Sequence, residues 1–275
     1  MKHAISVHLE SFAFSSNPAI ANLSSEEKKR LDNGSIVTQV DRLIDLFKAH
    51  NQQATIFVVS IIDTWYPDLL DKLKAAGHEV AWHGHTHGRL HTSESFRREL
   101  DLAAGFIDKF KPLGYCSPEF CFWEEGYHLL REAGFKYSNS CLSDSAPVEI
   151  DGILEIPVSA YRWGGGNSPK QCRGISLGML AREVPFGSSF IIALIRGAAT
   201  VWFIKKREKK TNAPSNLFFH NWQAFDEGEA ARRDRMWYFR KNPLYFPYLL
   251  NIERPLRHIL ARVQFTTLQA AYLHR

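Results

Sequence analysis

Strand-like and helix-like segments alternate along this 275-residue chain, and this alternation constrains its fold more than any other feature. The run ATIFVVS at 54–60 is continuously apolar and rich in β-branched residues, which predicts a strand buried on both faces. The run before it, 37–50, repeats apolar residues at i, i+3, i+4 and i+7, as one face of a helix does. Further strands are expected at 4–9, 78–82, 136–140, 153–159, 216–220 and 262–267, and further helices at 66–77, 93–110 and 124–134. Such an order predicts an α/β fold built around a parallel sheet.

Residues typical of helix ends mark two of these helices. Pro67 is expected at the start of the helix at 66–77, and Gly77 at its end. Ser93 is predicted to cap the amino end of the helix at 93–110.

Composition limits the class of protein. The chain is 45% hydrophobic, enough for a full core, and shows no internal repeat or linker, so we expect one catalytic domain over 1–275. The net charge of +5 is spread along the chain apart from the run KKREKK at 205–210. This surplus is too small to indicate a nucleic-acid partner, and none is expected.

The cysteines and the first residues bear on the cellular compartment. Cys116, Cys121, Cys141 and Cys172 have neither CxxC spacing nor the density of a disulfide scaffold, which predicts reduced thiols. The start MKH runs directly into the strand AISVHL, so we expect no signal peptide and a cytoplasmic protein.

Histidines and a carboxylate gather where predicted strands end. His8 and Glu10 are two residues apart on a strand, so their side chains share a face. His83 and His87 follow another strand, and His220 ends a late one. Two histidines and a distant carboxylate are the ligand set of an open catalytic zinc site. Because carboxyl ends of parallel strands meet at one mouth, we expect these side chains to converge.

Other histidines in these segments have plainer interpretations. A single histidine at a strand end is more often a loop or capping residue than a ligand, and three clusters in the right order are what favour a metal site. His85 is interpreted as a loop residue or a neighbour of the ligands, and His78 as structural, at a helix-to-strand turn.

At these residues the chain resembles the polysaccharide deacetylases, the NodB-homology or family 4 carbohydrate esterases. The segments that carry the resemblance are HLES at 8–11, QATIFVVS at 53–60, LLDKLKAAGHEVAWHGHTHGRL at 69–90, GYCSPE at 114–119, LREAGFKYSNS at 130–140, EIPVS at 155–159, LFFH at 217–220 and QFTTLQ at 264–269. The resemblance implies a distorted (β/α)7 barrel and metal-dependent removal of N-acetyl groups from amino sugars.

The resemblance also implies roles for single residues. Glu10, His83 and His87 match the metal ligands, and His220 matches the general acid that protonates the departing amine. The SPEF segment, with Pro118 and Glu119, matches the groove that binds substrate.

Two positions depart from the family pattern. The catalytic-base aspartate is replaced by His8, and the arginine that orients it is replaced by Cys116, which also lies in the substrate groove. A third change is Ser138, where many relatives have an aspartate. A guanidinium would disfavour a cationic histidine beside it, so replacing base and arginine together removes a conflict.

The histidine at position 8 leaves three interpretations of the site open. In the first, a neutral His8 takes a proton from the attacking water and the chain is an active hydrolase, which is the preferred interpretation. In the second, His8 is a fourth ligand that closes the site. In the third, the protein is a degenerate, metal-containing pseudoenzyme that only binds sugar.

Aromatic residues supply further candidates. Trp163 and Trp222 are expected to stack on sugar faces, although a packed turn explains the segment 161–169 equally well. Gly164 to Gly166 would let that segment fold over the site. The aromatic run 235–250 is expected to pack a terminal helix, with an oligomer interface as the alternative, and the oligomeric state is not identified.

The segment 186–210 combines an apolar run with the basic cluster. It is too short to span a membrane, so the simpler prediction is a buried barrel helix followed by a solvated basic turn. The alternative is a peripheral contact with the inner membrane surface.

A cytoplasmic location narrows the expected substrate. Acylated amino sugars occur there on nucleotide or lipid carriers, which favours a role in the biosynthesis of surface polysaccharide precursors such as O-antigen or capsule, with a glycan as the other candidate substrate. The ligand set suits Zn²⁺ and also accepts Co²⁺, Ni²⁺ or Fe²⁺.

Overall fold

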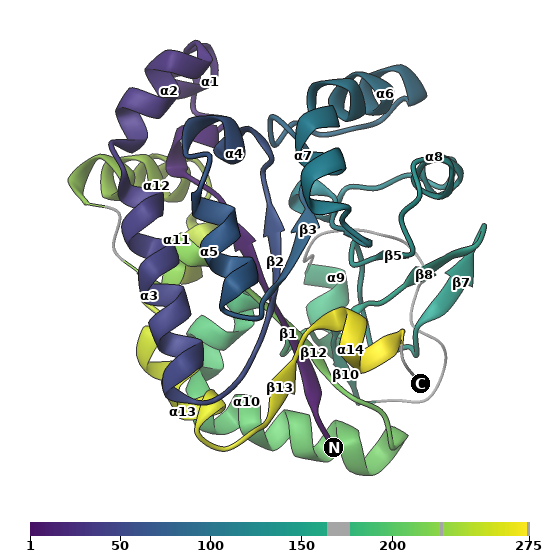
Figure 1. The fold of residues 1–275 in the computed structure, drawn as a ribbon. Coiled ribbons are helices and arrows are strands. Elements are labelled where there is room, and N and C mark those ends of the chain that lie inside the picture. The colour runs from purple at the N-terminus through teal and green to yellow at the C-terminus, as the bar shows by residue number, and fades with distance from the viewer. Residues whose placement is uncertain (164–176, 226–227, 274–275) are drawn as a thin grey trace.

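The computed structural model describes residues 1–163, 177–225 and 228–273 and shows a curled, mostly parallel sheet with helices packed around it (Figure 1). The strands are β1 (His3–Leu9), β2 (Thr55–Val58), β3 (Glu79–Trp82), β4 (Gly114–Tyr115), β5 (Tyr137–Ser138), β6 (Leu142–Ser143), β7 (Val148–Ile150), β8 (Ile153–Glu155), β9 (Val158–Ser159), β10 (Tyr161–Arg162), β11 (Glu183–Val184), β12 (Asn216–His220) and β13 (Phe265–Thr266). The α-helices are α1 (Pro18–Ala21), α2 (Ser25–Asp32), α3 (Ser35–Ala49), α4 (Ile61–Trp65), α5 (Leu69–Ala75), α6 (Ser93–Leu102), α7 (Ala104–Phe110), α8 (Gly126–Glu132), α9 (Leu177–Leu180), α10 (Ser189–Thr211), α11 (Asn221–Ala224), α12 (Glu229–Lys241), α13 (Glu253–Leu260) and α14 (Leu268–Tyr272). Three 3-10 turns are η1 (Phe12–Phe14), η2 (Pro118–Phe120) and η3 (Pro243–Leu249).

The main sheet has the order β12-β1-β2-β3-β4-β5-β8-β7, and β13 also pairs with β1. Every pair in it is parallel except β7 with β8. Strand β1 therefore lies inside the sheet, and its register places His8 opposite His220 on one side and Phe57 on the other. This register brings the ends of strands that are far apart in the sequence to one place.

The sheet curls into a half-barrel, and a short segment at Gly187 connects β9, which pairs with β6 outside the main sheet, to β12. The Gly187 N–H donates to the Ser159 carbonyl at 2.9 Å, and the Phe218 N–H donates to the Gly187 carbonyl at 2.8 Å. A Cβ at Gly187 would lie 2.5 Å from the Asn216 carbonyl oxygen, so the backbones meet only because this residue has no side chain. The predicted α/β barrel-type fold is confirmed, with a sheet that is curled rather than a regular closed ring.

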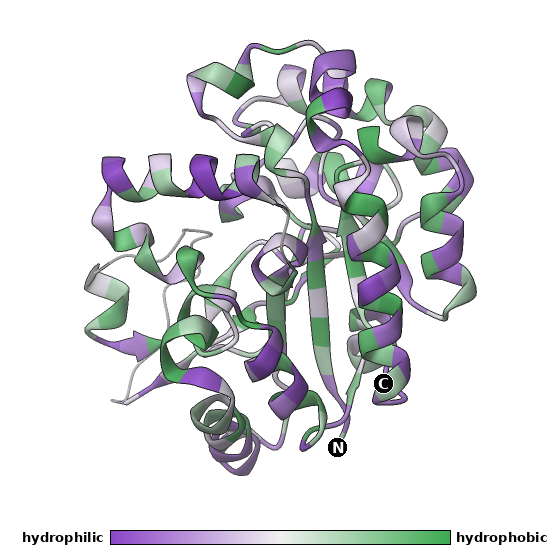
Figure 2. Ribbon diagram, turned by 90° about the vertical axis from the view of Figure 1, so that its left-hand side faces the viewer, coloured by the Kyte–Doolittle hydropathy of each residue, from purple (hydrophilic) through white to green (hydrophobic). Residues whose placement is uncertain are grey.

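The core lies between the sheet and its helices. All residues of β1 and β2 are buried, and Figure 2 shows apolar central strands beside helices whose faces alternate in hydropathy. Helix α3 buries Val40, Leu43 and Phe47, as its spacing predicts. His78 is buried and its Nδ1 accepts the N–H of Ala54 at 3.2 Å, which fits the structural role expected of it.

Four details of the predicted elements were wrong. The helix expected at 93–110 is two helices, α6 and α7, which meet at Ala103. Its cap is Thr92 rather than Ser93, because Thr92 is the extended residue and its hydroxyl accepts the Ser95 N–H at 3.1 Å. Helix α5 begins after Pro67, at Leu69, and the strand expected at 153–159 is divided into β8 and β9.

Helix α10 accounts for most of the segment 186–210. It is interrupted at Arg196, where φ is 64°, and none of the described helices is long and apolar enough to cross a membrane. The basic run is partly used within the fold: buried Arg207 donates to the Pro214 carbonyl at 2.9 Å, and Lys210 donates to Asp144 at 2.7 Å. The membrane contact through 186–210 stays a prediction.

Candidate metal and active site

One carboxylate oxygen, Oε1 of Glu10, is surrounded by four imidazoles. It lies 3.1 Å from Nε2 of His83, 3.3 Å from Nε2 of His87, 3.7 Å from Nδ1 of His8 and 3.9 Å from Nε2 of His220. Glu10, His83 and His87 each offer a ligand atom, all within 4.8 Å of one another. The structure thus brings together the residues expected as ligands, base and acid.

The sheet holds the carboxylate in place from its backbone. Glu10 follows directly after β1, and its N–H donates to Asn221 Oδ1 at 2.9 Å while its carbonyl accepts from Asn221 Nδ2 at 2.8 Å. Because Asn221 follows His220 at the end of β12, this pair of bonds fixes the ends of two neighbouring strands. Sequence reasoning missed Asn221, although it stands next to a histidine that was singled out.

A strained loop positions His87 after β3. His87 is a non-glycine residue at φ 63°, and Gly84 before it has φ 78°. The carboxylate of Glu99, on α6, accepts the N–H of His85 at 2.6 Å and the N–H of Thr86 at 2.9 Å. Its other oxygen accepts the Thr86 hydroxyl at 2.7 Å. Glu99 was not predicted from the sequence, and it anchors the loop that carries His87.

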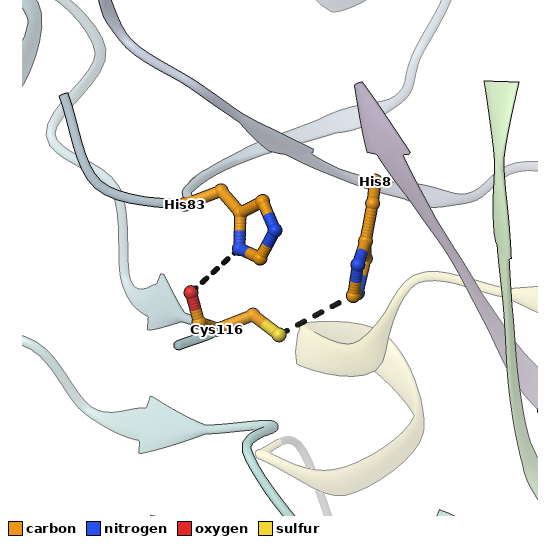
Figure 3. A group of neighbouring side chains, drawn as sticks. All are labelled: His8, His83 and Cys116. Atoms are coloured by element: carbon orange, nitrogen blue, oxygen red, sulfur yellow. Dashed lines mark hydrogen bonds between the residues drawn. The ribbon is translucent and has the colours of Figure 1, made fainter. Parts of the chain in front are cut away.

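His83 provides the clearest indication that a cation fits here. Its Nδ1 lies 2.7 Å from the carbonyl oxygen of Cys116, which can only accept, so Nδ1 carries a proton (Figure 3). Burial lowers the pKa of His83 below the usual imidazole value, which leaves Nε2 as a lone pair facing Oε1 of Glu10. Two electron-rich atoms in such contact are satisfied by a cation that binds both, and a carbonyl partner on Nδ1 is the usual support of a metal-binding histidine.

The surroundings of the clustered histidines and of Glu10 shift their pKa values in different directions. Burial lowers the pKa of His8 well below its usual value and that of His220 to about 4, so both are neutral at pH 7. Burial lowers the pKa of His87, but the carboxylates of Glu10, Glu119 and Glu99 together raise it by more, and the net shift is upward. The pKa of Glu10 is held well below its usual range, because its histidine neighbours outweigh the effect of burial.

His8 and Cys116, the two positions that depart from the family pattern, touch each other. The Cys116 sulfur lies 3.5 Å from Nε2 of His8, as the second dashed line of Figure 3 shows, and both residues are buried. The His8 ring stacks on Phe218 at 4.7 Å and meets Phe120 at 5.6 Å. The His8 ring and the Cys116 sulfur therefore share apolar surroundings, in which an arginine at 116 would place a charge beside the imidazole. Nearby Ser138 is buried and donates to the Ser140 hydroxyl.

Most of the expected groove residues lie around this cluster. Trp222 donates its indole N–H to Oε2 of Glu10 at 3.3 Å and stacks on His220 at 4.7 Å. Pro118 begins η2, and Glu119 on the same turn accepts from Arg89 Nε at 2.7 Å. Because Arg89 follows the His87 loop, this ion pair joins two sides of the site.

Trp163 is placed elsewhere. It is exposed, and its ring contacts Tyr161 at 5.3 Å and Phe203 at 5.9 Å, while Lys206 Nζ lies 5.3 Å from the ring centroid. Its expected role in sugar binding stays a prediction. The glycines at 164–166 and Cys172 lie outside the described residues.

His220 has a hydroxyl partner that the sequence did not indicate. Its Nδ1 lies 3.2 Å from Oγ of Ser189, the first residue of α10. His85, by contrast, turns its Nδ1 to the Ser60 hydroxyl at 3.1 Å, in agreement with its interpretation as a loop residue beside the ligands.

Part of the chain matches a known protein family. Residues 31–136 match the family model described as polysaccharide deacetylase, which covers His83, His87 and Cys116 but neither His8, Glu10 nor His220. A search of curated proteins finds no match.

Three similar solved structures establish the fold. A protein from Mycobacterium smegmatis, assigned to the polysaccharide deacetylases, has a TM-score of 0.55 at 18% identity, over 94% of this chain and 89% of that one. PuuE allantoinase has a TM-score of 0.52 at 17% identity, over 99% and 91%. A probable polysaccharide deacetylase from Pseudomonas aeruginosa PAO1 has a TM-score of 0.51 at 17% identity, over 93% and 89%.

Proposed function

We propose that this chain, which has the polysaccharide deacetylase fold and matches that family model over residues 31–136, is a metal-dependent deacylase of N-acylated amino sugars. The observation that carries the proposal is the convergence of imidazoles on one oxygen of Glu10, with His83 turning a lone pair toward it. The proposal treats 1–275 as one catalytic domain, in line with the pairing of β1 with both β12 and β13.

Glu10, His83 and His87 would hold the metal, with Zn²⁺ as the first candidate and Co²⁺, Ni²⁺ or Fe²⁺ as others. A divalent ion there would polarise the acyl carbonyl and stabilise the negative charge that develops on its oxygen. Trp222 supports the ligand set, because its N–H bond to Oε2 leaves Oε1 facing the histidines.

His8 is proposed as the general base. It is neutral, buried and adjacent to Glu10, so it can take a proton from the attacking water. Its aromatic surroundings disfavour the resulting imidazolium, which favours passing the proton on.

His220 is proposed to return a proton to the amine nitrogen. Since its pKa is lowered to about 4, it is neutral before the reaction and must first receive the proton that it donates. Its ring lies 5.3 Å from that of His8, so the two imidazoles are close enough to serve one reacting amide bond.

The substrate is proposed to be an acylated amino sugar on a nucleotide or lipid carrier, from the biosynthesis of a surface polysaccharide such as O-antigen or capsule in the cytoplasm. Cys116, Pro118, Glu119 and Trp222 would line its binding groove. The aromatic surroundings of His8, formed by Phe120 and Phe218, suit an uncharged acyl group such as acetyl better than a charged one.

A second candidate is a sugar-binding protein without hydrolysis. His8, Glu10 and His220 also form a group of ligand atoms within 4.8 Å, which supports His8 as a candidate fourth ligand. A closed site of this kind would keep the metal and exclude the reactive water.

The test combines zinc content with hydrolysis of N-acetylated sugars. The active hydrolase predicts about one zinc per chain, a loss of activity in His8→Ala without loss of zinc, and an acidic limb in the pH profile of the wild type. His85→Ala, a histidine of the same loop outside the ligand set, is the matched control and should retain zinc and activity.

The second candidate makes the opposite prediction. Every acylated sugar tested would stay intact with the wild type, His8→Ala would lose zinc affinity, and His8→Asp with Cys116→Arg would create activity. Circular dichroism of each variant separates these outcomes from misfolding.

A further inference from the structure

The segment after α12 carries an exposed apolar turn, defined here as Pro243 to Phe246. Leu244 is 58% exposed, Tyr245 39% and Phe246 47%, and Met236 on α12 is also exposed. Single apolar residues at a surface are ordinary, but consecutive ones on a protruding turn indicate a contact with something outside the chain.

The apolar turn is held outward by the fold. Within η3, Pro247 is buried and its carbonyl accepts from Gln223 Nε2 at 3.1 Å, while the Asn242 side chain accepts the Leu244 N–H at 3.1 Å. Helix α12 is tied to the loop after β1, where the Tyr238 hydroxyl accepts the Ser16 N–H at 2.8 Å. The turn is therefore presented rigidly and does not collapse onto the core.

A chain of ring contacts connects the apolar turn to the candidate site. Tyr245 lies 5.9 Å from Tyr248, and Tyr248 lies 5.8 Å from His220 and 5.6 Å from Trp222. The turn therefore lies on the side of the site where His220 and Trp222 approach Glu10.

Basic residues flank the apolar turn. Helix α12 carries five arginines and lysines against two acidic residues. Of the acidic pair, Asp234 is buried and hydrogen-bonded to Asn17, and Glu229 is paired with Arg233. Arg240 and Lys241, directly before the turn, are exposed. This combination of apolar tip and basic flank is complementary to anionic lipid.

We propose that the apolar turn inserts into the headgroup region of an anionic membrane, with Arg240 and Lys241 on the lipid phosphates, so that the mouth of the site faces the bilayer. The inference deepens the proposed function, on which it rests in one respect: the membrane would present the amino sugar on a lipid carrier. Leu244 has no ring to stack on a free sugar, and two copies of a basic surface repel each other, so the features favour lipid over a soluble glycan or a second copy.

The basic run at 205–210 is less suited to bring the site to a membrane. Glu208 lies 3.7 Å from His3 at the start of β1, whereas Glu10 follows the end of that strand. The run is thus at the opposite end of the sheet from the mouth, and Lys210 is already paired with Asp144. A membrane at that surface would not meet the site.

The test is co-sedimentation of the zinc-loaded full chain with phosphatidylglycerol–phosphatidylcholine vesicles, compared with phosphatidylcholine vesicles alone. The wild type should bind the anionic vesicles, with binding weakened by salt. Leu244→Ser with Phe246→Ser, and separately Arg240→Glu with Lys241→Glu, should each lower the partition coefficient about tenfold or more. Lys205→Glu with Lys209→Glu makes the same charge change on α10 and should alter it less than about twofold.

Three results would overturn the proposal. These are a wild type that does not bind anionic vesicles, turn variants that bind as well as the wild type, and loss of binding in the α10 variant alone. Light scattering adds a fourth: a dimeric wild type that becomes monomeric in Leu244→Ser with Phe246→Ser would make the turn a dimer interface. Hydrolysis of a water-soluble N-acetylated sugar, which the turn variants should retain, reports on the proposed function separately from docking.

Discussion

Replacement of Glu99 tests whether the loop that carries His87 is held by a carboxylate on α6. Glu99→Ala removes an acceptor of two backbone N–H groups, those of His85 and Thr86, and of the Thr86 hydroxyl. Glu99→Gln keeps one oxygen for the two N–H groups and turns its amide toward a hydroxyl that can also accept. The two variants therefore separate the position of the side chain from its charge.

The expected magnitudes follow from these three bonds. Hydrogen bonds to a charged group contribute about 1.5–3 kcal/mol each, and water replaces part of this where the loop is open, as at exposed Thr86. We expect Glu99→Ala to lower the free energy of unfolding by about 3 kcal/mol and Glu99→Gln by about 1 kcal/mol. If His87 is a metal ligand, loosening its loop should also weaken zinc binding by roughly 10- to 100-fold in Glu99→Ala.

The assay is urea unfolding of the chelated protein, followed by competition for zinc against a chromophoric chelator. Glu94→Ala, an exposed carboxylate on the same helix, is the matched control and should change the unfolding free energy by less than about 0.5 kcal/mol. A Glu99→Ala protein as stable as the control, with wild-type zinc affinity, would show that the loop holds its shape without this anchor.

Three further predictions concern separate parts of the fold. Burial of the His3 ring disfavours its charged form and lowers its pKa from 6.5 to about 4, and the neutral ring accepts the Ser215 N–H at Nδ1, 2.9 Å away. The unfolded chain therefore takes up the proton first as pH falls, so stability is full above pH 6.5 and falls by about 3 kcal/mol toward pH 4. His3→Asn keeps the acceptor without the titration, and pH-dependent unfolding should show that fall reduced; an unchanged slope would contradict the assignment. Gly187→Ala would place a methyl group 2.5 Å from the Asn216 carbonyl oxygen. Thermal unfolding should show that the free energy of unfolding falls by about 3 kcal/mol. A variant as stable as the wild type would mean that the two backbones can separate at little cost. Trp222→Phe removes the indole N–H bond to the Glu10 carboxylate but keeps an aromatic ring. The zinc affinity should fall about tenfold, with little change in the free energy of unfolding. A variant with the zinc affinity of the wild type would refute this expectation.

The sequence predicted the parts of the site that depend on strand ends. His8, His83 and His220 each lie at or just after an apolar run, and parallel strands bring such ends together whatever the details of their connections. The alternation of segments was enough to predict both the sheet and this convergence.

What supports the site could not be predicted in the same way. The bonds of Glu99 to the His87 loop, and of Asn221 to Glu10, depend on how α6 and α11 pack against the sheet, and no local pattern encodes that packing. The capping residue before α6 was misjudged for a local reason, because Thr92 and Ser93 are adjacent and both cap helices well.

The contact between His8 and Cys116 was predicted only in part. Both were singled out as departures from a family pattern, but only the structure shows that the sulfur and the ring are 3.5 Å apart. Their contact makes the two replacements a single change of one pocket.

The place of β1 inside the sheet sets the order in which the molecule can be completed. Strand β1 is made first, yet its partner β12 and the clamp of Asn221 on Glu10 follow 211 residues later. At a synthesis rate of about 5–20 residues per second, the ribosome needs roughly 10–40 s to supply them. During that interval one edge of β1 is unpaired, and Glu10, although already made, is not yet held by Asn221. A metal ion bound as proposed would therefore be taken up late, after closure of the sheet, and a chain stalled before β12 would expose an aggregation-prone strand.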